Sequence, residues 1–90
     1  MKKDLLKIFY NYGLSNQLKK LVEEVYELCE AILTDDGSEE ALLHIEEEYA
    51  DVENVLEQFR FYKELDITRI VTNRVEKVNR QLERMKKNER

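Results

Sequence analysis

Apolar residues recur at helical spacing along most of this 90-residue chain, and no segment sustains the alternation that is typical of a strand. A short first helix is expected from about Lys3 to Asn11. The second helix is expected from an N-cap at Ser15 to about Leu33, and its apolar stripe is Leu18, Leu21, Val22, Val25, Leu28, Cys29 and Ile32. The pattern therefore predicts an all-α fold.

Two further helices follow. The third is expected from Glu39 to about Glu64, with an apolar stripe of Ala41, Ile45, Tyr49, Val52, Leu56 and Phe59. The fourth is expected from Ile67 to about Lys87, with Ile70, Val71, Val75, Val78, Leu82 and Met85. The breaks fall at Gly13, at the polar turn 35–38 with Ser38 as an N-cap, and at Asp66, which can cap the last helix.

These elements predict one domain over residues 1–90, with a short leading helix in 1–13, three longer helices and a frayed tail at 86–90. At about 1.5 Å per residue the third helix is about 39 Å long, which exceeds what a 90-residue globule needs. We therefore expect an antiparallel helical bundle that is completed by oligomerisation, as a homodimer or a dimer of dimers.

Composition and charge exclude several classes of protein. A single cysteine cannot form an internal disulfide, and the chain has neither a long apolar run nor the apolar core of a signal peptide, so we expect a cytoplasmic protein without a membrane span. The net charge of −5 divides into −9 for residues 1–65 and +4 for residues 66–90. An acidic chain of this kind is not expected to bind nucleic acid.

Carboxylates gather in the middle of the second and the third predicted helix. Glu24 with Glu27, and Glu48 with Asp51, have the i,i+3 spacing that places two side chains on one helix face. Four carboxylates from two neighbouring helices would form an oxygen cage that suits Mg²⁺ or Mn²⁺. Glu48 lies at the edge of the apolar stripe of its helix. Glu27 points away from the apolar stripe of its own helix, so a site that uses Glu27 needs another element over the face that carries it.

A solvated acidic face is the alternative interpretation of the same residues. The chain has four acid pairs at i,i+3, about the number that its composition gives by chance. On that interpretation the protein is a non-catalytic helical interaction module.

The acids and their order resemble a known family. Glu23-Glu24-x-x-Glu27, followed on the next helix by Glu48-x-x-Asp51, resembles the EExxE…ExxD signature of the MazG-like all-α nucleoside triphosphate pyrophosphohydrolases, the superfamily of dCTP pyrophosphatases and dimeric dUTPases. The resemblance covers roughly residues 14–82, and it extends to three neighbouring segments: 16–24, 49–52 and 65–67.

The resemblance implies a Mg²⁺-dependent enzyme that cleaves a nucleoside triphosphate between its α- and β-phosphates. The implied metal ligands are Glu24, Glu27, Glu48 and Asp51, with Glu24 and Glu27 as the catalytic pair and Glu23 as an auxiliary acid. The implied substrate-binding residues are Asn16 and, on the fourth helix, Arg74, Lys77 and Asn79. The expected partners are a nucleotide substrate and further copies of the chain.

Overall fold

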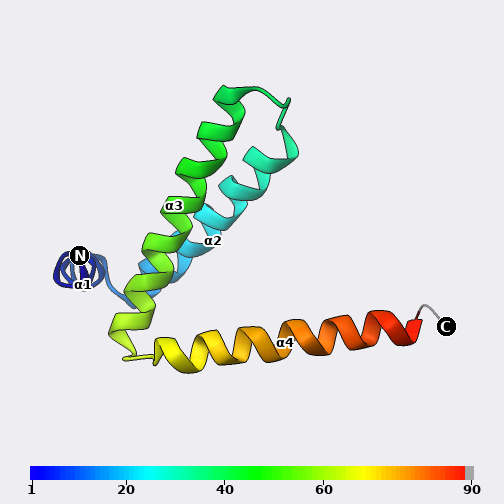
Figure 1. Cartoon of the computed structure of the whole chain (residues 1–90). Helices are drawn as coiled ribbons and strands as arrows, with labels where there is room; N and C mark the ends of the chain where they lie inside the picture. Colours follow the sequence, from blue (N-terminus) through cyan, green and yellow to red (C-terminus); the bar gives the residue numbers. More distant parts are fainter. Residues whose placement is uncertain (89–90) are drawn as a thin grey trace.

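The computed structural model describes residues 1–88 and consists of four helices, with no strand among those residues. Their bounds are α1 Lys2–Tyr12, α2 Leu14–Leu33, α3 Glu39–Tyr62 and α4 Ile67–Asn88. Helices α2 and α3 form an antiparallel hairpin, α1 crosses the base of that hairpin, and α4 runs away from it (Figure 1). The predicted all-α fold is confirmed.

The helix boundaries follow from a few residues with special backbone or capping roles. Gly13 has φ +88°, a conformation that favours glycine, and it separates α1 from α2. Ser38 accepts a 3.1 Å hydrogen bond from the Ala41 N–H, which caps α3 as expected. The Asp66 carboxylate accepts bonds of 2.8 and 3.1 Å from the Thr68 and Arg69 N–H groups at the start of α4.

Two boundary predictions differ from the structure. Ser15 is not the N-cap of α2, because Gly13 occupies that position and Ser15 already lies inside the helix. Helix α3 ends at Tyr62 rather than at Glu64, which has φ +53° in the turn that follows. Helix α4 continues through Asn88, and the rest of the tail expected to fray, residues 89–90, lies outside the described residues.

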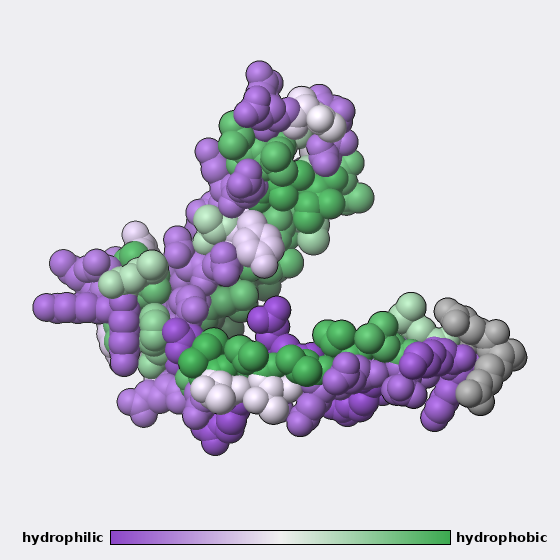
Figure 2. Space-filling model, in the orientation of Figure 1, coloured by the Kyte–Doolittle hydropathy of each residue, from purple (hydrophilic) through white to green (hydrophobic). Residues whose placement is uncertain are grey.

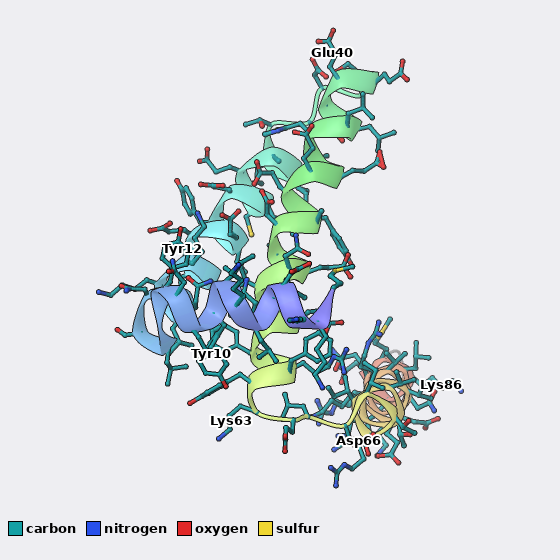
Figure 3. All side chains as sticks on the ribbon, turned by 90° about the vertical axis from the view of Figure 1, so that its left-hand side faces the viewer. Tyr10, Tyr12, Glu40, Lys63, Asp66 and Lys86 are labelled. Atoms are coloured by element: carbon teal, nitrogen blue, oxygen red, sulfur yellow. The ribbon has the colours of Figure 1, made fainter. Side chains whose placement is uncertain are left out.

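The buried core is small. Leu5, Phe9 and Val55 lie where α1 meets the hairpin, and Ala31 is buried near the other end of the hairpin, in the last turn of α2. The Phe9 ring stacks on Tyr62 at a centroid distance of 4.3 Å and meets Phe59 edge-on at 5.7 Å. These contacts fix α1 against the last turns of α3, so that α1 crosses the hairpin in Figure 3.

Helix α2 meets α3 through a different face from the predicted apolar stripe. Its least exposed residues recur at heptad spacing and are Gln17, Leu21, Glu24, Leu28 and Ala31. The neighbouring face, which carries most of the predicted stripe, is exposed; it consists of Leu18, Val22, Val25, Cys29 and Ile32. The stripe predicted from the sequence therefore merged two faces. Cys29, which this stripe would place in the interior, is exposed.

Helix α4 packs against none of the other three helices and buries no residue. The radius of gyration is 16.7 Å, whereas a compact chain of this length has about 12 Å. Within one chain, packing between helices is thus confined to residues 1–62, and the antiparallel pair is α2 with α3. None of the helices in the described part of the chain has the length and apolarity needed to cross a membrane.

Candidate metal centre

Three carboxylates converge where α2 and α3 face each other. Glu24 and Glu27 project from α2 and Glu48 from α3, and one oxygen of each lies within 4.8 Å of the others. Glu24 is buried, Glu48 is half-buried and Glu27 is exposed, so the trio opens to solvent on the Glu27 side. Glu27 is exposed, as expected for a residue that points away from the apolar stripe. It reaches the other two carboxylates without a further element over that face, because Glu24 lies in the seam itself and Glu27 is its i+3 neighbour.

The two less exposed carboxylates each have one oxygen near a side-chain nitrogen and one oxygen without a partner. Glu24 is 5% exposed; its Oε1 lies 3.0 Å from Lys20 Nζ, and its buried Oε2 has no hydrogen-bond partner. Glu48 Oε1 lies 3.9 Å from His44 Nδ1, and its buried Oε2 is also unpartnered. Burial of an unpartnered carboxylate oxygen is costly, so this space favours a cation.

The electrostatics of the three carboxylates also favour a cation. The negative charge of Glu24 raises the pKa of Glu27, and partial desolvation and the neighbouring Glu48 raise it further, while Lys20 opposes the shift. A raised carboxyl pKa records repulsion between like charges that no nearby cation fully compensates. The arrangement therefore has more negative charge than its own partners neutralise.

Lys20 and His44 were not assigned to the site from the sequence. Each lies four residues before its carboxylate, Lys20 before Glu24 and His44 before Glu48. That i,i+4 spacing is the signal that identifies both contacts in retrospect.

A cleft of about 480 Å³ adjoins the trio on the side covered by α1. Four of the sequence-predicted site residues line it, namely Asn16, Glu23, Glu24 and Asp51. Asp51 lies in this cleft and not in the group of three converging oxygens. Tyr12 contributes one wall, and the Asn16 amide donates a 2.7 Å hydrogen bond to the Tyr12 carbonyl.

The predicted substrate-binding residues of α4 lie away from the carboxylates. Arg74 lines a separate groove at the elbow between α3 and α4, and Asn79 lies further along α4. Because α4 packs against neither α2 nor α3, a single chain does not bring Arg74, Lys77 or Asn79 to the trio.

Comparisons with protein-family models, with curated proteins and with solved structures give no match. The resemblance to the MazG-like pyrophosphohydrolases therefore remains a prediction, carried by the residues of this chain.

Proposed function

We propose that this chain is a cytoplasmic, Mg²⁺-dependent hydrolase that converts a nucleoside triphosphate to the monophosphate and pyrophosphate. One observation carries the proposal: buried carboxylate oxygens of Glu24 and Glu48, from two facing helices, lack a partner beside a third carboxylate, Glu27. A solvated acidic face would leave such oxygens in contact with water.

The donor set fits a hard divalent cation. Glu24, Glu27 and Glu48 would hold it, with Asp51 available from the adjoining cleft. When bound, Mg²⁺ or Mn²⁺ would offset part of the negative charge of a triphosphate, polarise its phosphorus and activate water for attack. An acidic protein needs such a cation in order to accept a polyanionic substrate.

Side chains of the chain itself would accept the proton and hold the carboxylates in position. Glu27 is exposed and has a raised pKa, which suits a carboxylate oxygen that takes the proton of the attacking water. The new bond joins the water oxygen to the α-phosphorus, and the bridging oxygen leaves with pyrophosphate. The ion pair with Lys20 holds Glu24 in position during this step.

The cleft beside the trio suits the nucleoside part of the substrate. Its lining combines amide side chains, Asn16 and Asn54, with the Tyr12 ring, and these groups can hydrogen-bond and stack against a base. Arg74, Lys77 and Asn79 lie on α4, which does not contact α2 or α3. They can contribute to phosphate binding only if α4 takes another position or belongs to another copy of the chain.

Pyrophosphate release tests the proposal directly. Each ribo- and deoxyribonucleoside triphosphate is incubated with the protein and Mg²⁺, or with Mn²⁺ in its place. We expect turnover of at least one nucleotide and a fall of about 100-fold in Glu48→Gln, which corresponds to about 3 kcal/mol of transition-state stabilisation. Glu47→Gln is the matched control, because Glu47 is exposed and lies outside the trio. Absence of turnover with every nucleotide contradicts the proposal.

A non-catalytic interaction module is the second candidate, favoured by the uncovered apolar face of α4. A thermal melt in EDTA and then in Mg²⁺ separates the two. A cation that binds the folded state raises Tm, whereas an interaction module with a solvated acidic face shows no such rise.

A further inference from the structure

Helix α4 presents an apolar face that nothing in the described chain covers. Its members are 47–58% exposed and are Ile67, Val71, Val75, Val78, Leu82 and Met85. The first half of α4 is rich in β-branched residues, which are weak helix formers, and most of the stability of a helix in a protein comes from packing of its amphipathic face. Packing against another surface is therefore what would stabilise α4.

The hairpin carries a matching apolar face. It is formed by the exposed residues Leu18, Val22, Val25 and Ile32 of α2 and by Leu42, Tyr49 and Leu56 of α3. Because the two helices are antiparallel, their spacing puts these residues on one side of the hairpin, opposite the cleft that holds Asn16, Glu23 and Asp51. Val22, at 71%, is among the most exposed of them.

The two apolar faces border one open notch. Figure 1 shows α4 leaving the hairpin at an elbow, and Figure 2 shows apolar surface along the sides of both that face the opening. The elbow itself is an apolar groove, lined among others by Leu28, Tyr49, Leu56, Leu65 and Ile70. The notch is therefore shaped to receive an amphipathic helical element.

The net charges of the hairpin and of α4 indicate which helical element fits the notch. The hairpin, residues 14–62, has 14 acidic and three basic side chains, a net charge of −11, whereas α4, residues 67–88, has two acidic and seven basic ones, a net charge of +5. A basic amphipathic helix about 33 Å long thus matches an acidic hairpin whose longer helix is about 36 Å long. A second copy of this chain offers that helix, and also offers a hairpin for the α4 of the first.

We propose that two copies form a two-fold dimer in which the apolar face of each α4 packs on the hairpin of the other. Both copies use the same pair of surfaces, as a closed two-fold interface requires. The contact is made twice, and it covers the apolar faces of α2, α3 and α4 together. This inference is independent of nucleotide hydrolysis, since it needs neither cation nor substrate.

The molecular mass in solution provides the first test. Sedimentation equilibrium of the full chain should give twice the 10.9 kDa of one chain. Val78→Asp places a charge on the apolar face and should give a monomer, whereas Asn73→Asp adds the same charge on the opposite side of α4 and should leave the dimer intact. A monomeric wild type, or a dimer that Val78→Asp does not weaken, overturns the proposal.

Exchange between copies provides the second test and separates the dimer from an α4 that folds back on its own hairpin. A nitroxide is attached at Lys86→Cys in a Cys29→Ser background, and this chain is mixed with ¹⁵N-labelled Cys29→Ser chain that carries no nitroxide. We expect broadened amide signals from the exposed apolar faces of α2 and α3 in the ¹⁵N chain. Unchanged signals in the mixture overturn the proposal, because only contact between chains can broaden them.

Discussion

Gln17 Nε2 donates a 2.7 Å hydrogen bond to Gln58 Oε1 across the seam between α2 and α3. Both amides are buried, at 5% and 3% exposure, in positions that a helical hairpin ordinarily fills with apolar residues. The pair is joined on the same α2 face by Glu24, so the seam carries polar groups along much of its length. These groups restrict the register of the two helices, because any shift would leave buried polar atoms unpaired.

Loss of one partner of the amide pair should destabilise the fold more than loss of both. Gln58→Leu leaves the buried Gln17 amide without its acceptor, and we expect a cost of about 1–3 kcal/mol in the free energy of unfolding. Urea denaturation of Gln17→Leu, Gln58→Leu and the double variant measures this. The double variant should lie within about 1 kcal/mol of the wild type, and additive effects of the single changes contradict the account.

Capping at the start of α3 makes a second prediction. Ser38→Ala removes the acceptor of the Ala41 N–H bond, so we expect a loss of about 1 kcal/mol in stability. Ser15→Ala is the control, since Ser15 lies within α2 and caps nothing. Thermal melts of the two variants should differ by several degrees. Equal melting temperatures would show that the Ser38 hydroxyl contributes little.

The sequence predicted the helices well because their boundaries rest on local chemistry. Gly13, Ser38 and Asp66 act within a few residues of themselves, and each marks a helix end in the structure. The face of α2 that meets α3 depends instead on long-range packing. Two faces of α2 have heptad spacing, and the more apolar one, which includes Val22 and Val25, is left exposed. Hydrophobicity alone therefore merged the buried face with the exposed one.

The candidate site was predicted only in part, because its local spacing can be found in the sequence whereas the burial of its side chains depends on long-range packing. The spacing of Glu24, Glu27 and Glu48 indicated a shared site, and the structure brings their oxygens together. Burial of Glu24 was not foreseen, because a carboxylate is rarely buried and most of the predicted stripe, including Val22 and Val25, lies on the neighbouring face of α2. The direction of α4 was equally inaccessible, since within one chain no contact determines it.

Binding of a divalent cation should couple to stability through Glu48. In EDTA, Glu48→Gln removes one of three neighbouring negative charges and should leave the protein as stable as the wild type or more stable. At a Mg²⁺ concentration 100 times Kd the wild type should gain about 2.7 kcal/mol, which the variant lacks. Thermal melts over a Mg²⁺ series measure the difference, with Glu47→Gln as the control. A rise in Tm that survives in Glu48→Gln places the cation elsewhere.

Glu27 should make the stability of the cation-free protein depend on pH. Its pKa is raised in the folded state, chiefly by Glu24, so folding is penalised above that pKa and not below the pKa of the unfolded chain. In EDTA, Glu27→Gln should therefore stabilise the protein at pH 7, and the gain should vanish as the pH falls through the folded-state pKa of Glu27. The gain is small because Glu27 is exposed. Urea midpoints across the pH range measure it, with Glu23→Gln as the control.

In Glu24→Gln, ¹³C NMR titration should give a lower Glu27 pKa, whereas an unchanged value would remove Glu24 as the cause.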